Sequence, residues 1–435
     1  MIRLIYNLFW PIGLLFFLPG YLVKMIRRGG YRAKFGQRFG IYDRELRVRL
    51  EKRRSTWLHA VSVGEVNIAL KLSRALRALE PELCCVLTTT TTTGFALAQR
   101  NAPPWIEVLY TPLDYWPIMR RAFSVIRPTR VILVEAEVWP NLVALAHQHG
   151  IPTILANARL SDRSERRFRR FRLILGPTFR LLDLVCVQEP DDVQRWAAIG
   201  IPRDRIRLVG SVKYDPDAHE AVLRRQESAQ LQQVETNHFN SKSQVLFGGS
   251  THRGEEEILA KIFLGLRQQF PSLQLFIAPR HVERLREIRT HFDRLPLRVT
   301  LASELASGVQ SEWDCIVLDT TGDLHRWYSV ASIVFIGKSL TAHGGQNPVE
   351  AIVAGKPVVF GPHMENFATL AKSLVLKNGA IQVLDVDSLQ TTVAELLRDS
   401  QACERLVQQA HEVLNEHRGA TTRTATLIHE LTPIQ

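Results

Sequence analysis

The 435-residue chain is 46% hydrophobic and 23% charged, which excludes an intrinsically disordered protein and leaves room for two globular domains. Its formal net charge of +12 favours an anionic partner, such as an acidic lipid, a phosphorylated substrate or a nucleic acid. Five cysteines without a CxxC pair argue against a disulfide framework or a zinc ribbon and indicate a reducing compartment.

The chain begins with an uncharged segment followed by a basic cluster. Residues 4–23 carry no charged side chain, and a run of that length is enough to cross a bilayer. Basic residues from Lys24 to Arg38 follow, which predicts that the next domain lies on the cytoplasmic side of a membrane. Pro11 and Pro19 interrupt the apolar run, so a spanning helix and a half-inserted hairpin both remain open. A buried core helix is the alternative that the basic flank disfavours. We expect residues 1–28 to be a membrane anchor.

The first half of the chain then alternates short apolar runs with amphipathic stretches. Apolar residues at helical spacing predict a helix over Val66–Leu79. The alternation predicts a parallel sheet with helices on both faces. Strands are predicted at Thr56–Val61, Cys84–Thr89, Val131–Val134, Thr153–Ala156 and Leu184–Val187.

A polar stretch separates this half from a second one of the same kind. Residues 213–244 include a long run rich in Gln, His and Asn, which predicts a link between domains. We therefore expect domains at 29–212 and 245–435, the second including the C-terminal helices, as two doubly wound domains facing a cleft. In the second half, strands are predicted at Val245–Phe247, Leu273–Ala278, Cys315–Leu318, Ile333–Ile336 and Val358–Phe360.

Three carboxylates follow predicted strands of the first half. Glu65 follows the first strand and opens its helix, where the helix start favours an ionised carboxylate that can act as a general base. Glu135 and Glu137 follow the buried run VILV, where carboxylates are costly unless something uses them. Being two residues apart, they would share a face in an extended chain. The structural alternatives are a plain first-turn glutamate and a salt-bridged loop pair.

Basic and glycine-rich groups mark three further positions. Lys213, in the segment GSVKYD, can neutralise a phosphate or a leaving group, and a surface lysine is the alternative. The turn Gly248–Glu256 follows a strand and opens a helix, so its backbone N–H groups can bind phosphate although it is not a P-loop. Arg280, at the end of the next strand, can pair with phosphate or carboxylate.

The segment Gly344–Ala351 combines a glycine pair with a helix start. Asn347 is predicted as the N-cap, Pro348 as the first helical residue and Glu350 as the third. Two glycines before the cap let a ligand approach the backbone, so the helix start can face a phosphate and Glu350 can reach ribose hydroxyls. The alternative is a helix in which Glu350 only folds back to complete a capping box.

A basic run and the histidines are the remaining groups with a possible role in binding. Arg163–Arg172 contains six arginines, and we expect them to contact anionic lipid headgroups rather than nucleic acid, because no nucleic-acid motif accompanies them. A solvated helix face is the alternative. The histidines show no metal-ligand spacing, so no metal site is predicted.

These motifs, in this order, resemble those of the 3-deoxy-D-manno-octulosonic acid (Kdo) transferases of Gram-negative lipopolysaccharide synthesis. The resemblance runs nearly end to end. It rests on YRAKFGQRFGIY, HAVSVGEV, TTTTTTG, EAEVWPN, NARLSDRS, GSVKYD, STHRGEEE, APRH, DTTGDL, GGQNPVEA and FGPHMENF.

The resemblance implies an α/β fold of the GT-B type, with two Rossmann-like domains facing a cleft and an N-terminal membrane anchor. It implies an inverting glycosyltransferase of the inner membrane, cytoplasmic side, that moves Kdo from CMP-Kdo to a lipid A precursor without a metal or other cofactor. In the family, Glu65 corresponds to the catalytic base, and Glu135 and Lys213 to residues that stabilise the transition state. The CMP contacts correspond to Pro279, Arg280, Thr321, Gly322, Asp323, Asn347, Pro348, Val349 and Glu350.

The chain departs from the family pattern at two places. Gly322-Asp323-Leu324 stands where the family usually has Gly-Glu-Leu, and Gly344-Gly345-Gln346-Asn347 stands where it usually has Gly-Gly-His-Asn. A GT-B transferase that uses a UDP-sugar and a membrane-bound lipid or nucleotide binder without catalysis are the alternative functions. The intact Glu65, Glu135 and Lys213 argue against the binder.

Overall fold

The computed structural model describes residues 3–10, 12–13, 34–160, 162–217, 243–306, 313–319 and 324–431. Most of the expected anchor and linker, and the expected CMP contacts Thr321, Gly322 and Asp323, lie outside these residues. The chain divides into two compact units. One comprises Met1–Asp215 with Gly419–Gln435, and the other comprises Pro216–Arg418.

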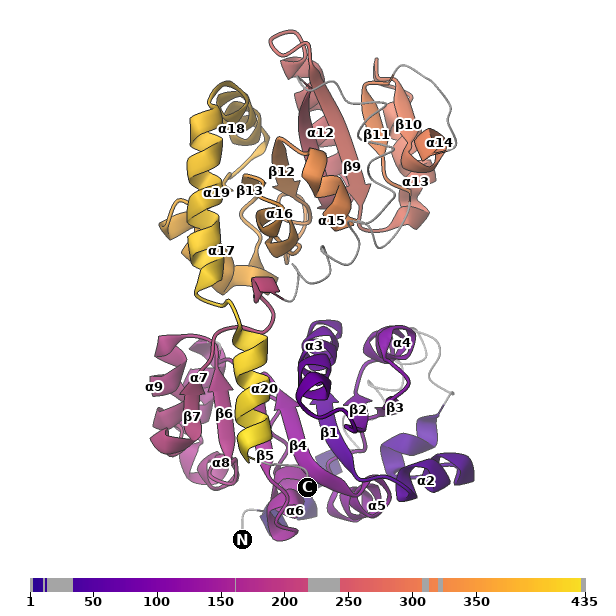
Figure 1. Cartoon of the computed structure of the whole chain (residues 1–435), viewed down its shortest axis with the longest axis vertical. Coiled ribbons are helices and arrows are strands. Elements are labelled where there is room, and N and C mark those ends of the chain that lie inside the picture. Colours follow the sequence, from indigo (N-terminus) through magenta and orange to yellow (C-terminus); the bar gives the residue numbers. More distant parts are fainter. Residues whose placement is uncertain are drawn as a thin grey trace. The chain divides into compact units, whose positions relative to one another are not determined.

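The first unit is built on a seven-stranded parallel sheet in the order β3-β2-β1-β4-β5-β6-β7 (Figure 1). Parallel neighbours need crossover connections, and helices supply them. The strands are β1 (Ser55–Ala60), β2 (Cys85–Thr89), β3 (Ile106–Tyr110), β4 (Pro128–Val134), β5 (Thr153–Ala158), β6 (Leu184–Val187) and β7 (Ile206–Leu208). The helices are η1 (Phe35–Phe39), α2 (Arg44–Glu51), α3 (Val63–Leu79), α4 (Thr92–Asn101), α5 (Trp116–Ile126), α6 (Pro140–Gln148), α7 (Asp162–Arg170), α8 (Arg172–Phe179), α9 (Pro190–Ala198), η2 (Arg203–Arg205) and α20 (Ala420–Leu431).

Alternate side chains of this sheet enter two separate cores. Trp57 and Leu133 belong to the core on one face, together with side chains of α2, α5, α6, α8 and α9. Leu58 and Ile132 belong to the core on the other face, together with side chains of α3, α4 and α20. A strand that is buried on both faces has a continuous apolar sequence, which is why runs such as VILV predict these strands well.

The second unit repeats the plan with the order β10-β11-β9-β8-β12-β13-β14, again parallel. Both predicted parallel sheets are therefore confirmed. The strands are β8 (Gln244–Thr251), β9 (Leu273–Pro279), β10 (Val299–Leu301), β11 (Cys315–Val317), β12 (Ile333–Ile336), β13 (Val358–Phe360) and β14 (Ile381–Gln382). The helices are α12 (Glu255–Leu266), η3 (Val282–Arg284), α13 (Leu285–Phe292), α14 (Ala302–Ala306), α15 (Leu324–Trp327), η4 (Tyr328–Val330), α16 (Val349–Val353), η5 (Glu365–Phe367), α17 (Ala368–Leu376), α18 (Val386–Arg398) and α19 (Ser400–Asn415).

Both faces of the second sheet are also covered. Side chains of α12, α13, α18 and α19 form a core on one face. Elsewhere on the sheet, the Tyr328 ring packs on Phe247 at 5.1 Å and the Trp327 ring on Phe276 at 6.1 Å between centroids.

The last helix belongs to the first unit, which corrects the expectation that residues 245–435 form one domain. In α20, Ala425 and Ile428 are fully buried in the core that includes α3. The Asp215 carboxylate fixes the return of the chain, since it accepts hydrogen bonds from the backbone N–H groups of Gly419 (3.0 Å) and Thr421 (2.8 Å). The helix closes over the first sheet because its apolar stripe is buried there.

The start of the chain also docks on the first unit. Residues 3–10 are helical. Asn7 exchanges two side-chain hydrogen bonds with Asn141, at 2.8 and 3.0 Å, and Trp10 stacks on Tyr115 with centroids 5.2 Å apart. Among the helices within the described ranges, none is both long enough and apolar enough to cross a bilayer.

Candidate active site

The carboxyl edge of the first sheet gathers the three residues predicted to do chemistry. Glu65 lies just after β1, Glu135 directly after β4, and Lys213 beyond β7. In a parallel sheet these positions share one edge, and Glu135 interacts electrostatically with both Glu65 and Lys213. The structure therefore brings the predicted catalytic group together within one unit.

Glu65 is a buried carboxylate held at the start of α3. Ser62 is the N-cap of the helix, and its hydroxyl donates a 2.7 Å hydrogen bond to Glu65 Oε1 while the Val61 N–H donates one of 2.8 Å to Oε2. Glu65 thus makes the contacts of a first-turn glutamate. Burial nevertheless raises the pKa of Glu65 to about 7, since it outweighs these hydrogen bonds, and the nearby charges of Glu135 and Glu137 act in the same direction.

The burial of Glu65 contradicts the expected preference for its ionised form but supports its expected role as a general base. The helix start was expected to favour the ionised form, but the carboxyl is only 7% exposed and desolvation dominates. A carboxyl with a pKa near neutrality is well matched to general base catalysis, because it accepts a proton readily and is still substantially ionised at pH 7.

Glu135 sits in a strained backbone conformation. Its φ of 63° lies in the left-handed region, which a non-glycine residue rarely adopts, and the Val138 N–H donates to the Ala136 carbonyl in the turn that follows. The chain is therefore not extended here, so the strand periodicity that would put Glu135 and Glu137 on one face does not apply. Burial raises the pKa of both carboxyls, and Lys213 and Arg159 oppose that shift at Glu135.

Lys213 is a half-buried cation beside this carboxylate cluster. Burial lowers the pKa of its ammonium to about 8, Glu135 opposes the shift, and Arg159 adds to it. A lysine with this pKa is still mainly charged at neutral pH, so it can stabilise negative charge that develops during a reaction. This partial burial disfavours the alternative of a fully exposed surface lysine.

Asn157 fixes the loop that carries Lys213, and sequence reasoning did not single it out. It too has a left-handed φ, 54°, at the end of β5. Its side-chain oxygen accepts the Val212 N–H at 3.0 Å, and its backbone carbonyl accepts the Gln188 amide at 2.8 Å. Asn157 and Arg159 both lie in the motif NARLSDRS, directly after a predicted strand, and that position was the signal available in the sequence.

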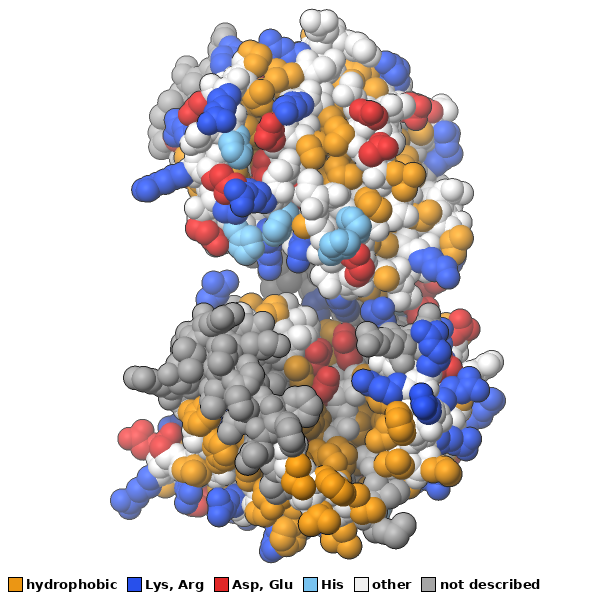
Figure 2. Space-filling view, turned by 180° about the vertical axis from the view of Figure 1, so that it is seen from behind, with side chains coloured by type: hydrophobic (Ala, Val, Ile, Leu, Met, Phe, Trp, Pro, Cys, Tyr) orange, Lys and Arg blue, Asp and Glu red, His pale blue; other side chains and the backbone are white. Residues whose placement is uncertain are grey.

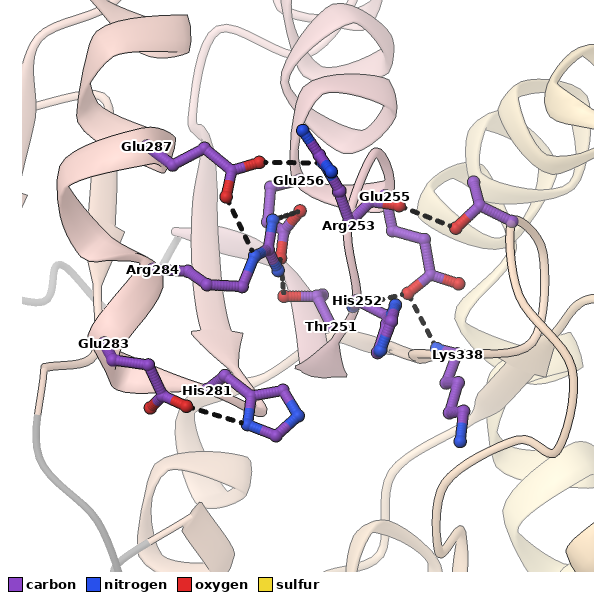
Figure 3. Close-up of polar contacts among 11 residues, drawn as sticks. Thr251, His252, Arg253, Glu255, Glu256, His281, Glu283, Arg284, Glu287 and Lys338 are labelled. Atoms are coloured by element: carbon purple, nitrogen blue, oxygen red, sulfur yellow. Dashed lines mark hydrogen bonds and ion pairs between the residues drawn. The ribbon is translucent and has the colours of Figure 1, made fainter. Parts of the chain in front are cut away.

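The carboxyl edge of the second sheet is organised by a buried glutamate, Glu255. Its carboxylate accepts four backbone N–H groups, those of His252 (2.8 Å), Lys338 (2.7 Å), Ser339 (3.0 Å) and Leu340 (3.1 Å). Figure 3 shows this carboxylate between the turn after β8 and the loop after β12. The N–H of His252 in the Gly248–Glu256 turn is therefore occupied by the protein itself, which restricts the phosphate-binding role expected of that turn.

A second ionic network flanks Glu255. Arg284 donates to Glu256 at 2.9 Å and to Glu287 at 3.2 Å, and Glu287 also pairs with Arg253 at 3.1 Å (Figure 3). Arg280, by contrast, has an exposed side chain, and its backbone N–H bonds the Thr251 carbonyl at 3.0 Å. Pro279 is the last residue of β9, so Arg280 emerges from the carboxyl edge as predicted.

The helix at the glycine pair begins later than predicted. Its first residue is Val349 and Pro348 is the N-cap, so Glu350 is the second helical residue. The side chain of Asn347 still accepts the Val349 N–H, at 3.2 Å. A capping box needs a carboxylate at the third position, so Glu350 cannot complete one here. The turn is fixed by backbone bonds from Gly345 to Lys338 (3.0 Å) and from Gln346 to Gly337 (3.1 Å).

Comparison with known proteins identifies the relatives of this chain. Residues 33–216 match the family model for 3-deoxy-D-manno-octulosonic-acid transferase (kdotransferase). The 3-deoxy-D-manno-octulosonic acid transferase of Haemophilus influenzae is 31% identical over 400 residues, which cover 92% of this chain and 91% of the relative. That of Bordetella pertussis is 29% identical over 385 residues, which cover 86% of each chain.

The fold also has solved counterparts. UDP-GlcNAc 2-epimerase from Neisseria meningitidis superposes with a TM-score of 0.54 at 15% identity, covering 86% of this chain and 100% of the epimerase. At that identity the likeness concerns the fold alone. It supports the architecture of two parallel-sheet α/β units.

Proposed function

The chain belongs to the 3-deoxy-D-manno-octulosonic acid (Kdo) transferase family, and we propose that it transfers Kdo from CMP-Kdo to a lipid A precursor in lipopolysaccharide synthesis. The observation that carries the proposal is the group of Glu65, Glu135 and Lys213 at one edge of the first sheet. The carboxyl of Glu65 has a pKa near 7, and Glu135 interacts electrostatically both with it and with the half-buried Lys213. This pairing suits removal of a proton from a hydroxyl and stabilisation of a leaving anion.

In the proposed reaction, Glu65 takes the proton of an acceptor hydroxyl. The oxygen bonds to the anomeric carbon of Kdo while the bond from that carbon to the CMP phosphate oxygen breaks, and CMP leaves with the electron pair. Attack from the face opposite CMP inverts the configuration. Lys213, with Glu135 holding its charge in place, is the proposed electrostatic stabiliser of the transition state.

We assign donor binding to the second unit. Pro279 ends β9 and Arg280 follows it, while the Asn347–Glu350 turn follows β12, so both lie at the carboxyl edge of that sheet. Arg280 is exposed and can pair with phosphate in a bidentate manner, and Glu350 can accept hydrogen bonds from ribose hydroxyls. The expected contacts at Thr321, Gly322 and Asp323 remain part of this proposal on the family resemblance.

Glu65→Gln tests the assignment of the base. The variant keeps a side-chain oxygen for the Val61 N–H but cannot take up a proton, so turnover of CMP-Kdo with a lipid A precursor should fall by at least ~10²-fold. CMP affinity should be unchanged. Glu45→Gln is the matched control, since Glu45 is also a first-turn glutamate but is exposed on α2. Turnover of Glu65→Gln within a few-fold of the control would show that Glu65 is not the base.

A competition assay tests the donor. CMP should inhibit transfer from CMP-Kdo more strongly than UDP does. Stronger inhibition by UDP would instead favour the alternative of a transferase that uses a UDP-sugar.

We further propose that the protein works at the cytoplasmic face of the inner membrane. The N-terminal helical segment is docked through Asn7 and Trp10, while Leu4, Leu8 and Phe9 are 75%, 71% and 58% exposed. Figure 2 shows hydrophobic side chains gathered at the lower end of the first unit. An exposed apolar face of this kind suits insertion into the headgroup region of a bilayer, as in an interfacial helix.

The basic run of the first unit supports the same orientation. It occupies α7 and the start of α8, and next to it Leu173 and Ile174 are 90% and 51% exposed. Arginines beside exposed apolar side chains suit contact with anionic headgroups. Helix α8 packs near α6, which carries Asn141, the partner of Asn7.

A further inference from the structure

Two loops of the second unit are tied together next to the glycine pair. One follows β12 and the other follows β13. The His363 N–H donates to the Ser339 carbonyl at 3.0 Å, the Asn366 N–H to the Gly344 carbonyl at 2.9 Å, and the Gly344 N–H to Glu365 Oε2 at 2.6 Å. These bonds hold the two loops in a fixed relation, so side chains that meet across them meet in a defined geometry.

Three such side chains present metal-ligand atoms to one another. Nδ1 of His343 lies 3.0 Å from Glu365 Oε1, and Nδ1 of His363 lies 3.4 Å from the same oxygen. The two imidazole rings are 4.0 Å apart between centroids, and ligand atoms of all three residues lie within 4.8 Å of one another. Ligands at the bond lengths of tetrahedral zinc are separated by about 3.3 Å, so two of the three separations already match that geometry.

The chemistry of the donors selects the class of ion. Two imidazoles and a carboxylate suit Zn²⁺ and its neighbours in the first transition row, whereas Mg²⁺ and Ca²⁺ prefer oxygen ligands throughout. The second carboxylate oxygen of Glu365 is already held by the Gly344 N–H, which orients the ligand as an outer-shell partner does. His343 and Glu365 are well exposed, with 78% and 54% of their side chains accessible, so an ion can enter from solution.

We propose that His343, His363 and Glu365 bind one Zn²⁺-class ion that clamps the loop after β12 to the loop after β13. The two histidines are twenty positions apart in the chain and form no short motif such as HExxH, which is why the sequence predicted no metal site. Three protein ligands leave a fourth position open for water or another oxygen ligand. The site lies beside Gly344 and Gly345, so the bound ion would fix the turn that precedes α16. The inference does not depend on the proposed function.

Titration of the full-length protein with Co²⁺ and Zn²⁺ tests the site. Co²⁺ reports tetrahedral coordination through its visible absorption, and calorimetry with Zn²⁺ gives the affinity and stoichiometry. We expect one equivalent of ion per chain and a Zn²⁺-dependent rise in the unfolding midpoint, because an ion that binds only the folded state stabilises it. His343→Ala and His363→Ala should each weaken binding at least tenfold.

The control is His281→Ala. His281 is an exposed histidine of the same unit whose Nδ1 lies 3.2 Å from Glu283 Oε1, so it forms a similar pair. Among the described residues, His281 and Glu283 do not belong to any group of three potential metal ligands. Binding should be unchanged in this control, and the midpoints of all three variants in the presence of a chelator should match the unmodified protein. Absence of saturable binding, or equal binding in His343→Ala and the unmodified protein, would overturn the proposal.

Discussion

The ionisation of Glu65 determines how the proposed reaction should depend on pH. Its pKa is raised to about 7, mainly by burial, so the carboxylate that acts as base is depleted below neutrality. We expect kcat/KM to rise with pH through about 7 and then level. Glu137→Gln removes a charge that contributes to the raised pKa, so the rising limb should move to lower pH. If the limb vanishes in Glu65→Gln but stays near pH 7 in Glu137→Gln, Glu65 is the titrating group and Glu137 does not raise its pKa.

The ionisation of Lys213 should produce a second limb in the pH profile of activity. Its pKa is lowered to about 8, so the stabilising positive charge is lost as the pH rises beyond that value. Activity should therefore fall above about pH 8. Lys213→Arg keeps the charge at every accessible pH, because a guanidinium does not deprotonate in this range. The falling limb should disappear in that variant even though its maximal rate drops. A falling limb that persists in Lys213→Arg would assign it to another group.

The position of Glu350 in α16 is not that of a capping residue. As the second helical residue of α16 it has no position in a capping box, so Glu350→Gln should leave the unfolding midpoint unchanged. If its carboxylate accepts ribose hydroxyls, loss of the charge should lower CMP affinity by about 1–3 kcal/mol. Calorimetric titration with CMP measures this, and Glu395→Gln, an exposed glutamate of α18, is the control. Equal CMP affinity in both variants would remove Glu350 from the nucleotide site.

The site residues show which features were accessible from sequence. Glu65, Glu135 and Lys213 could be named because each follows an apolar run that reads as a strand, or lies in a motif of the family. The left-handed backbone of Glu135 could not, because tertiary contacts impose that conformation against the intrinsic preference of glutamate. Arg159 and Asn157 act through partners that are distant in sequence, namely Glu135 and the Lys213 loop.

The strands show a similar limit to what the sequence can predict. Every strand predicted from the sequence is present, and four that were not predicted are β3, β7, β10 and β14. These four are the edge strands of the two sheets. An edge strand has one unpaired side and a partly exposed surface, so its sequence lacks the continuous apolar run of a central strand. In β7, for example, only the first of three residues is buried.

Helix α20 illustrates how an amphipathic element can be assigned to the wrong domain. Its apolar stripe predicts that it packs on something, but the local sequence does not say on which sheet. The structure places it on α3, with His429 Nδ1 2.9 Å from the buried Glu80 carboxylate, which in turn pairs with Arg130 at 2.6 Å. The C-terminal helix is therefore part of the core that supports the Glu65 edge.

Substitution in α20 should consequently destabilise the first unit. Ile428 is fully buried, so Ile428→Ala should lower the free energy of unfolding by about 2–5 kcal/mol through lost burial and cavity formation. Leu431→Ala, at a position that is 41% exposed on the same helix, should cost far less. Denaturant unfolding followed by tryptophan fluorescence, to which the buried Trp57 and Trp196 of this unit contribute, measures both. Equal effects of the two substitutions would show that α20 does not pack as described.

At the scale of the whole chain, the proposed association with a membrane is the property to test. The uncharged segment 4–23, the exposed apolar side chains of the N-terminal helix and the excess of positive charge all predict association with an anionic bilayer. The contributions differ in their response to salt. Electrostatic attraction is screened at high ionic strength, whereas burial of apolar side chains in lipid is not. Binding that persists at high salt therefore reports insertion.

Sedimentation with phosphatidylglycerol vesicles at high salt measures that insertion. Deletion of residues 4–23 should release the protein, and Leu8→Ser with Phe9→Ser should reduce its partition into vesicles at least tenfold, because each side chain contributes about 1.5–3 kcal/mol when buried. The substitutions leave Asn7 and Trp10 to hold the segment on the first unit. Leu376→Ser with Leu384→Ser is the matched control, since these leucines are 71% and 75% exposed on the second unit. Full binding of the deletion variant at high salt would place the insertion elsewhere, with the exposed Leu173 and Ile174 as the next surface to test.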